Sequence, residues 1–493
     1  MSKRVLVYIS MLAMVLAAAL MVGCGSGGGS GSRSSPLDGS VVAFGADAPL
    51  CDVESFVVTI TSAALVPQAG GTPVSLITST SPATVDFARL ADFSNILSTA
   101  SVPPGTYNQL NLSISSPQLI TLNTSTSPPS AQSVAVTLTA TTFNIPISPA
   151  LVITSSTTSG LLVDLNLIQS VQVNGVGQAT GTVDPQFTVS APAVAGTTVG
   201  EADALYGMVG TPSTTNLPSG FTGSFPLTLA DGAGQTLTIL VNQNTVLEGD
   251  GVATFADLAA NTFVEVDALI NTSGQIIAQT IDAEEQVSAG SEKSAILGRV
   301  TGVARDVAGN AISLTLLVED EIPEMSATIP LDSTLTVTLA NTTHYFSNWQ
   351  NWNPQAFTFG PQTLGVAEKV AVYGTLGTGS PPPMTATQVF LRPRNVLGNF
   401  RTVIGAAADG KTGGFSMTPC GALFAGQPIT VLTYANTNFT GINGLNGLTA
   451  APTIDTNGVL FYLQTDGTSG TGINWVGPTW VMQARGVHQL PAN

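Results

Sequence analysis

The chain's richest mixture of aromatic rings and side-chain amides lies between His344 and Phe357 and includes Tyr345, Trp349 and Trp352. Aromatic rings stack on the apolar face of a sugar, and neighbouring Asn and Gln side chains can bond its hydroxyls. Tyr345, Trp349 and Trp352 are therefore candidate sugar-binding residues. The alternative, which we favour, is that these rings close the end of a barrel or an interdomain contact.

Two basic residues, Lys3 and Arg4, precede a predominantly apolar run over residues 5–22, which is typical of a secretory signal. These 18 residues almost suffice to span a bilayer, so a retained anchor helix is the competing interpretation. The run leads into Gly23 and Cys24, and this junction resembles the lipobox of bacterial lipoproteins, although Met21 stands where Leu is usual. The resemblance implies cleavage before Cys24, a diacylglyceryl thioether on its sulfur and acylation of the new amine.

Residues 24–38, which follow the signal of residues 1–23, are rich in Gly and Ser and are typical of a flexible tether. Two or more acyl chains hold a protein stably on a membrane, so Cys24 is the predicted lipid anchor. Gly25 rather than Asp follows the cysteine, which in Gram-negative lipoproteins implies sorting to the outer membrane. We therefore expect an outer-membrane lipoprotein of the cell envelope, either periplasmic or surface-exposed.

The other two cysteines, Cys51 and Cys420, are 369 residues apart. In an oxidising envelope they could form a disulfide that ties the first domain to the last. The sequence sets no distance between them, and we favour the alternative that both are buried free thiols. No Cys-x-x-Cys pair occurs, so zinc and redox sites built on that motif are not expected.

Groups suited to catalysis are sparse. The histidines are His344 and His488, and nothing near either predicts a catalytic triad. Carboxylates gather at residues 248–250, 282–285 and 319–324, but none of these matches a twelve-residue calcium loop, so a solvated acidic surface is favoured over calcium. We therefore expect no enzyme, no catalytic residue, no metal and no cofactor, with calcium as an alternative.

The overall charge argues against one class of partner. The 13 Lys and Arg residues stand against 30 Asp and Glu residues, a formal net charge of -17 in 493 residues. Nucleic-acid binding needs a basic surface to neutralise phosphates, so no nucleic acid is expected. Only 9% of the residues are charged and 43% are hydrophobic, with abundant Thr, Val and Gly, which favours an all-β protein.

Strands with a period of two begin after the tether. Phe56, Val58 and Ile60 alternate with more polar neighbours, and similar alternation runs through residues 107–114 and 161–167. This pattern predicts an antiparallel β-sandwich over residues 39–192. The spacing of residues 88–97 fits one short helix.

Several segments of this first domain resemble a known family in the right order. They are Asp47–Pro49, Asp52–Ser62, Val85-Asp86 and Pro104–Tyr107. Together they resemble domain of unknown function 4382, which is found in bacterial lipoproteins and secreted proteins. The resemblance covers about residues 39–192 and implies a β-sandwich without established chemistry.

The rest of the chain repeats three ordered landmarks. An apolar pair precedes Gly207, Gly298 and Gly398; a Thr/Val/Leu strand runs into Asn244-Thr245, Asn341-Thr342 and Asn436-Thr437; and an Ala-x-x-Val/Ile motif starts at Ala278, Ala386 and Ala484. Such spacing predicts tandem domains over residues 204–285, 295–392 and 395–490.

The first copy, with Ala230–Gly232, Phe255–Leu258 and Gly274–Ala278, resembles domain of unknown function 5666. The second copy fits less closely and the third is the most diverged. The resemblance and the short strands predict an N-terminal sandwich followed by about three small β-barrel-like domains.

These features predict a lipid-anchored cell-envelope protein with a non-enzymatic structural, adhesive or binding role. Its expected partners are the membrane, through the lipid anchor, and a polysaccharide or another envelope protein. The alternative is an extracytoplasmic carbohydrate-binding protein or a carboxylate-based hydrolase, whose carboxylate separation the sequence does not set.

Overall fold

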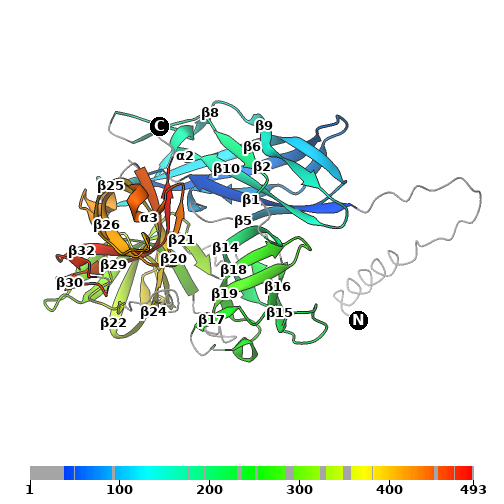
Figure 1. Cartoon of the computed structure of the whole chain (residues 1–493). Helices are drawn as coiled ribbons and strands as arrows, with labels where there is room; N and C mark the ends of the chain where they lie inside the picture. The colour runs from blue at the N-terminus through cyan, green and yellow to red at the C-terminus, as the bar shows by residue number, and fades with distance from the viewer. Residues whose placement is uncertain are drawn as a thin grey trace, which may run out of the picture. The chain divides into compact units, whose positions relative to one another are not determined.

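A computed structural model of the chain is shown in Figure 1. The structure describes residues 38–48, 50–90, 95–175, 178–192, 196–229, 236–249, 252, 254–283, 294–322, 329–347, 357–379, 381–448, 453–470 and 472–490. Asp38–Asn493 form one compact unit. The predicted signal, nearly all of the tether and Cys24 lie outside the described residues. None of the helices that the structure describes is long and apolar enough to cross a membrane.

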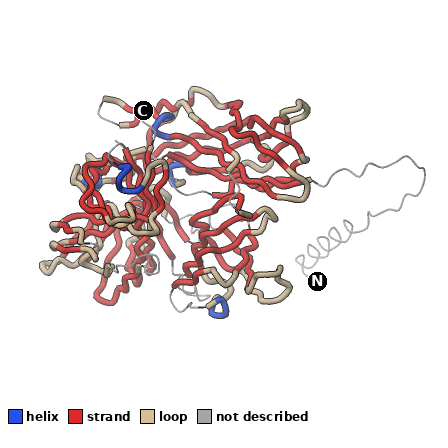
Figure 2. Tube along the Cα trace, viewed as in Figure 1, coloured by secondary structure: helices blue, strands red, loops and turns tan. Residues whose placement is uncertain are grey.

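The first domain consists almost entirely of strands (Figure 2). Its elements are β1 (Gly39–Ala48), β2 (Val53–Pro67), β3 (Val74–Ile77), β4 (Ala83–Asp86), η1 (Phe87–Arg89), β5 (Asn95–Val102), β6 (Gly105–Asn123), β7 (Ser130–Val134), β8 (Thr137–Leu138), β9 (Thr142–Ile153), β10 (Thr158–Asn166), α2 (Leu167–Ser170), β11 (Val171–Val173), β12 (Ala179–Val183) and β13 (Phe187–Ser190).

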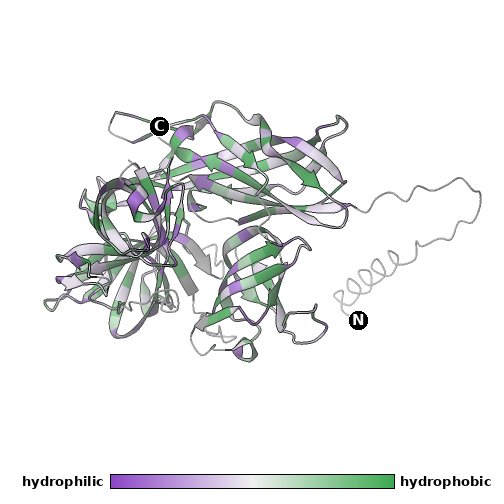
Figure 3. Cartoon of the chain, in the orientation of Figure 1, coloured by the Kyte–Doolittle hydropathy of each residue, from purple (hydrophilic) through white to green (hydrophobic). Residues whose placement is uncertain are grey.

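Ten of these strands form one sheet in the order β3-β2-β6-β9-β13-β10-β1-β5, with β4 on β2 and β7 on β6. The predicted alternation is confirmed, because Phe56, Val58 and Ile60 are all buried in the core. Hydrophobic and polar residues accordingly alternate along the strands in Figure 3. A separate sheet has the order β11-β12-β8.

Three pairings depart from the predicted antiparallel sandwich, because β1 runs parallel to β10, β9 to β13 and β8 to β12. Strand β1 is buried on both faces, as parallel strands commonly are. Val41 and Ala43 belong to the core of the first domain, whereas Val42 and Phe44 belong to a core shared with the following barrel. The sheet is therefore mixed.

The helix predicted over residues 88–97 is wrong. The structure has the short 3-10 helix η1 at Phe87–Arg89 and the strand β5 from Asn95, while residues 91–94 lie outside the described part. Strand β5 pairs antiparallel with β1. Hydrogen bonding to a neighbouring strand has therefore overridden the local helical spacing.

Three barrels follow. The first contains β14 (Thr198–Val209), β15 (Gly223–Leu229), β16 (Thr236–Val241), β17 (Val246–Gly249), η2 (Phe255–Asp257), β18 (Phe263–Asn271) and β19 (Ile276–Ala283). The second contains β20 (Ser294–Arg305), β21 (Ala311–Ile322), β22 (Thr334–Phe346), β23 (Lys369–Leu376) and β24 (Met384–Arg392). The third contains β25 (Arg394–Ala406), β26 (Gly413–Pro419), η4 (Ala422–Phe424), β27 (Ile429–Thr433), β28 (Asn438–Thr440), α3 (Gly444–Gly447), β29 (Thr453–Leu463), β30 (Gly467–Thr468), β31 (Asn474–Trp475) and β32 (Thr479–Gln489).

All three barrels share one strand pairing. Five strands of each barrel correspond, leaving aside the short strands β17, β28, β30 and β31. The first of the five (β14, β20 or β25) pairs antiparallel with the second (β15, β21 or β26) and with the fourth (β18, β23 or β29). The third (β16, β22 or β27) pairs parallel with the last (β19, β24 or β32), which closes the barrel. The prediction of three small barrels is confirmed, and the five-stranded pairing is that of the OB fold.

The glycine landmark has a steric cause. Gly207, Gly298 and Gly398 lie at equivalent positions on the first strand of each barrel, where that strand is paired with the second. A Cβ added at any of the three would overlap a backbone carbonyl of the second strand, that of Thr228, Leu317 or Thr418. Each first strand needs glycine because the neighbouring backbone approaches so closely.

The other two landmarks meet in space. The hydroxyl of Thr245 donates to the carbonyl of Ala278, and Thr343 and Thr437 donate equivalently to Ala386 and Ala484. In the second barrel the bonding residue is thus Thr343, which follows the Asn341-Thr342 landmark directly. The strand there continues past Asn341, and the register places the neighbouring threonine towards the core.

Candidate functional site

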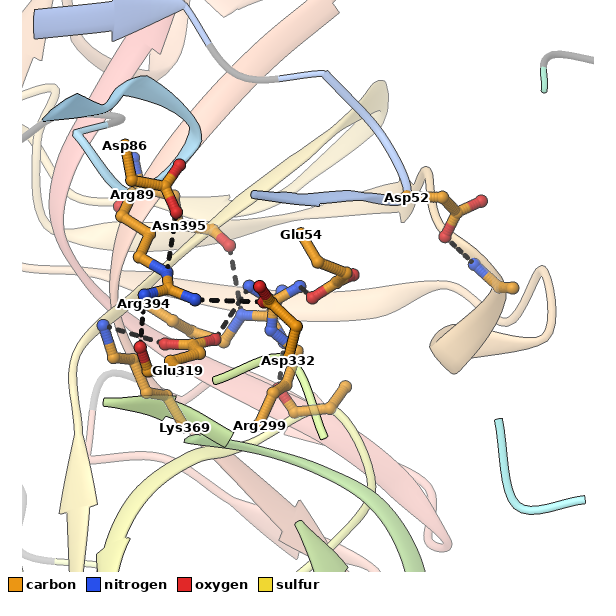
Figure 4. A network of polar contacts seen from close by, with 12 residues as sticks. Asp52, Glu54, Asp86, Arg89, Arg299, Glu319, Asp332, Lys369, Arg394 and Asn395 are labelled. Carbon is orange, nitrogen blue, oxygen red and sulfur yellow. Dashed lines mark hydrogen bonds and ion pairs between the residues drawn. The ribbon is translucent and has the colours of Figure 1, made fainter. Parts of the chain in front are cut away.

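A cavity of about 110 Å³ lies where the first domain meets the second and third barrels. Four basic side chains line it, namely those of Arg89, Arg299, Lys369 and Arg394 (Figure 4). Of the 13 basic residues in the chain, the structure describes nine, since residues 3, 4, 33 and 293 fall outside its described part. Nearly half of the described basic residues therefore converge on one place in an acidic protein.

Arg299 on β20 links the first domain to the second barrel. Its Nη1 lies 2.7 Å from Oε2 of Glu54, a side chain that is only 2% exposed at the start of β2. Its Nη2 lies 3.2 Å from Oε1 of Glu319 on β21. The other oxygen of Glu319 lies 3.3 Å from Nζ of Lys369 on β23. Because Glu54 is an inward position of a buried strand, an arginine from another domain has to neutralise it there.

Arg89 reaches the same cavity from η1. Its Nε lies 3.1 Å from a carboxylate oxygen of Asp86, and its Nη2 lies 3.1 Å from Oδ1 of Asp332. Its Nη1 donates to the backbone carbonyl of Glu319. This arginine is therefore held by carboxylates from both the first domain and the second barrel.

The two carboxylates that contact Arg299 have opposite pKa shifts. Burial raises the pKa of Glu54 above its ordinary value, against the charge of Arg299. Burial would raise the pKa of Glu319 too, but Lys369 and Arg299 overcome it and hold that pKa at about 2. Glu319 therefore stays ionised throughout the neutral range, and it is the central anion of the cluster.

Arg394, the first residue of β25, is bonded differently. Its Nη1 donates to the carbonyl of Ala367, its Nε donates to the carbonyl of Asn395 at 3.1 Å, and its Cζ lies 5.5 Å from the ring centre of Phe424. Among the described residues, no carboxylate forms an ion pair with it. Burial, reinforced by the nearby charge of Arg299, lowers its pKa to about 9.

A disulfide borders the same cavity. Cys51 and Cys420 are bonded, with their Cα atoms 5.7 Å apart, so the preference for two free thiols was wrong. The next residue, Asp52, accepts a hydrogen bond of 2.8 Å from the backbone N–H of Ala422. The first domain and the third barrel are thus joined covalently, and a contact across 369 residues has no local sequence signal.

A second ionic cluster joins the first and second barrels. Nη1 of Arg392, which is 3% exposed at the end of β24, lies 2.7 Å from Oδ2 of Asp282 and 2.9 Å from Oε2 of Glu265. Burial raises the pKa of Glu265 to about 7, although the charge of Arg392 opposes this rise. The predicted acidic cluster at residues 282–285 is therefore, at Asp282, part of an interdomain contact.

A buried carboxylate also joins the second and third barrels. Glu368 is fully buried and accepts hydrogen bonds from the backbone N–H groups of Gly365 at 2.9 Å and Tyr462 at 2.8 Å. Burial raises its pKa well above the ordinary value, against these two bonds. Its role in the structure is to satisfy backbone donors across the contact.

Of the three candidate sugar-binding residues, the structure describes Tyr345. Trp349 and Trp352 lie outside the described residues. Tyr345 is half-buried, packs edge-on against Phe359 and has a pKa that burial raises to about 12. Tyr345 therefore contributes to the packing of the second barrel.

Among the residues that the structure describes, the remaining candidates are not brought together at one catalytic or metal site. His344 is exposed on β22 and stacks on Phe346, while His488 is half-buried in the last strand. Glu319 is engaged in ion pairs, and the side chains of residues 248, 250, 284, 285, 320, 321 and 324 lie outside the description. In the part of the chain that the structure covers, no three His, Cys, Asp or Glu residues are placed to hold a metal ion.

Sequence reasoning missed the basic cluster as a site. The available signal was rarity, because each Lys or Arg is conspicuous in a chain with 9% charged residues. A second signal was Glu54, a carboxylate at an apolar position of a predicted strand, which requires a cation from elsewhere. Neither signal identifies Arg299 as that cation.

Two segments match models of known families. Residues 40–181 match the Domain of unknown function (DUF4382), and residues 224–282 match the Domain of unknown function (DUF5666). Both resemblances are confirmed, and the first barrel contains the second match.

No curated protein matches the chain. Among solved structures, one titled "drosophila Unr CSD456" matches at 9% identity, covering 59% of this chain and 99% of that chain. Its TM-score of 0.14 is too low to support any argument about fold or function.

Proposed function

We propose that this chain, with its DUF4382 and DUF5666 domains, is a lipid-anchored protein of the cell envelope with a non-enzymatic structural, adhesive or binding role. The observation that carries the proposal is the disulfide between Cys51 and Cys420. Disulfides form and persist in oxidising compartments outside the cytoplasm. This agrees with the signal-like N-terminus and with lipidation of Cys24.

The contacts between domains support a structural role. Four of these contacts contain a bond that resists separation: the disulfide, the pair of Arg299 with Glu54, the pair of Arg392 with Asp282, and the bonds of Glu368. Removing one partner of a buried ion pair strongly destabilises the folded protein, because the other charge stays buried without compensation. A body held together at these four contacts suits the presentation of a fixed surface to a polymer or to another envelope protein.

The buried carboxylates also support a non-enzymatic role. Glu319, Glu368 and Asp282, all buried, are engaged by ion pairs or backbone donors. A general acid or base has to reach a substrate, whereas Glu319 is paired inside the second barrel and Asp282 and Glu368 are bonded across contacts between barrels.

Lipidation provides the first test. A strain expressing the full precursor is fed an alkyne fatty acid, and the protein is then coupled to a dye. We expect the label to disappear in Cys24→Ser and to persist in Met21→Leu, which restores the usual lipobox residue and serves as the matched control. Label retained in Cys24→Ser would overturn the anchor.

Membrane fractionation gives the second test. We expect the parent protein in the outer membrane and Gly25→Asp in the inner membrane, because the residue after the lipidated cysteine directs sorting. Recovery of the parent protein in the cytoplasm would overturn the envelope assignment altogether.

A further inference from the structure

A pocket separate from the charged cavity lies where the first domain meets the first barrel. Its volume is about 420 Å³, within the range of roughly 300–1,000 Å³ that is usual for small-molecule sites. Its walls come from four segments, namely residues 38–40 at the start of β1, residues 99–101 at the end of β5, residues 156–158 at the start of β10, and Ser273 between β18 and β19.

Hydroxyl groups dominate the walls of this pocket. Seven of its ten lining residues carry one, namely Ser40, Thr99, Ser101, Ser156, Thr157, Thr158 and Ser273. The other three are Asp38, Gly39 and Ala100, so none of the described lining residues is basic or aromatic. Each hydroxyl can both donate and accept hydrogen bonds, and the carboxylate of Asp38 accepts them.

Hydrogen bonds within and between the two domains hold these walls in place. Oγ of Ser40 lies 2.7 Å from Oγ1 of Thr158, and Oγ of Ser101 donates to Oδ2 of Asp38 at 3.1 Å. The backbone N–H of Thr158 donates to the carbonyl of Thr272 at 2.7 Å, which ties the barrel turn to the first domain. A site whose shape is already fixed loses little ordering entropy when a ligand binds.

Several polar groups of the pocket remain available to a ligand. The hydroxyls of Thr99, Ser156 and Ser273 form no hydrogen bond within the part of the chain that the structure describes. Asp38 has a second carboxylate oxygen besides the one that Ser101 contacts. All four of these side chains are exposed, so a ligand from solution can reach them.

The residue types of the walls select among classes of ligand. An anion would meet a carboxylate and no cation, and an apolar ligand would find no apolar side chain larger than that of Ala100. Calcium takes several oxygen ligands, whereas Asp38 is the single carboxylate among the described lining residues. A neutral molecule with many hydroxyls fits best, since it can exchange donors and acceptors with such a wall.

We propose that this pocket binds a neutral saccharide unit through its hydroxyl groups, with the carboxylate of Asp38 as the charged acceptor. This assignment names a ligand for the binding role proposed above and rests on that role. Cys24 and Asp38 are 14 positions apart, so a fully extended tether would hold the pocket at most about 50 Å from the lipid anchor. The saccharide is either part of a free glycan or the headgroup of a glycolipid, which share this chemistry.

The test uses the mature full-length chain with Cys24→Ser, so that binding to vesicles does not depend on its own lipid. The probes are an array of neutral and acidic oligosaccharides, and phosphatidylcholine vesicles with and without monoglucosyl diacylglycerol. We expect neutral glycans to bind more tightly than those with uronic or sialic acid, which Asp38 repels. Binding to array glycans identifies a free glycan, and binding confined to the glucolipid vesicles identifies a headgroup.

Two substitutions locate the binding. Ser273→Trp fills the pocket from the barrel turn and should weaken binding by about tenfold or more. Its matched control is Thr378→Trp, an exposed residue in the corresponding turn of the second barrel, between β23 and β24, which should leave binding unchanged. Asp38→Asn removes the charged acceptor at nearly constant size and should weaken binding about tenfold. Its control is Asp184→Asn, an exposed carboxylate of the first domain that accepts a bond from Thr139 outside the pocket.

The proposal is overturned if the parent binds neither the array nor the vesicles, if acidic glycans bind most tightly, or if Ser273→Trp binds as tightly as Thr378→Trp. Cooperative thermal unfolding shows whether Ser273→Trp is folded. If it is not, equal binding by Asp38→Asn and Asp184→Asn overturns the proposal instead. The fatty-acid label on Cys24 is measured separately, so failure of saccharide binding and failure of the lipid anchor are distinguishable.

Discussion

The hydroxyl of Thr437 donates a hydrogen bond of 2.8 Å to the carbonyl of Ala484 inside the third barrel. The same oxygen accepts a bond of 2.9 Å from the backbone N–H of Tyr434. One threonine therefore satisfies two backbone groups where the chain leaves its third strand. Because the first and second barrels repeat the arrangement, it is a feature of the barrel and not of one loop.

Removing this hydroxyl should destabilise the third barrel. Thr437 is fully buried, so Thr437→Val leaves an N–H and a carbonyl without partners in the interior, which costs about 1–3 kcal/mol. Thr245 is only half-buried, so Thr245→Val should cost less. Urea denaturation followed by fluorescence measures both. Thr440→Val on exposed β28 is the control, and an equal loss in this variant would contradict the explanation.

The disulfide should contribute to the stability of the whole body. Cys51→Ser with Cys420→Ser removes a link across 369 residues and should cost about 2–5 kcal/mol. The parent should lose the same stability in reductant, whereas the double variant should not respond to it. Thiol titration of the denatured, unreduced protein carrying Cys24→Ser gives an independent check: two reactive thiols per chain would mean that the bridge does not form.

The contact between the first domain and the second barrel should depend on Arg299. Arg299→Met keeps much of the side-chain length but leaves Glu54 buried without its cation, at a cost on the order of 3 kcal/mol. Adding Glu54→Gln to Arg299→Met should recover part of the lost stability, because the buried carboxylate that has no cation is then replaced by a neutral amide. Differential scanning calorimetry measures the three proteins, with Arg401→Met on the exposed face as control. A double variant no more stable than Arg299→Met alone would refute this account.

Stability should fall as the pH rises through the range in which Glu265 titrates. Its pKa is raised by burial from an ordinary value of 4.5 to about 7, so between these values the folded state binds more protons than the unfolded state. The free energy of unfolding therefore decreases with pH in this window, by on the order of 3 kcal/mol for this group. Glu265→Gln should flatten that slope, since Asp282 still pairs with Arg392.

Glu319 should give the opposite pH dependence of stability to Glu265 in the same experiment. The pKa of Glu319 is held at about 2 by Lys369 and Arg299 despite burial, so its contribution is lost as the pH falls below 4.5 towards 2. Melting temperatures between pH 2 and pH 9 should thus decrease on both sides of a maximum. The exposed Glu201→Gln serves as control for Glu265→Gln, and an equally flattened slope there would contradict the assignment.

Much of the secondary structure was predictable, since period-two burial is a local property. Phe56, Val58 and Ile60 face one core because alternate residues of a strand point to one side. The repeat was visible because each barrel needs a glycine where two backbones meet closely, as at Gly298. Thr343 lies one residue beyond the Asn341-Thr342 landmark, because register within a strand depends on pairing with its neighbour.

The charged cavity was not predictable, although its members stand plainly in the sequence. Glu54 and Arg299 are 245 residues apart, and their pairing exists only because the second barrel docks on the first domain. Local periodicity carries no information about which surfaces of different domains meet. The same limit applies to the parallel pairing of β1 with β10, which joins two segments far apart in the sequence.

By itself, the sequence determined an all-β chain, an N-terminal sandwich-like domain, three repeated barrels and the inward faces of their strands. These features depend on the alternation of neighbouring residues along a strand and on the glycines required where two backbones approach closely. Tertiary structure alone decided that Cys51 meets Cys420, that Arg299 neutralises Glu54, and that Arg394 lines a cavity with Arg89. These contacts depend on distances between segments hundreds of residues apart. Only the packing of whole domains sets such distances.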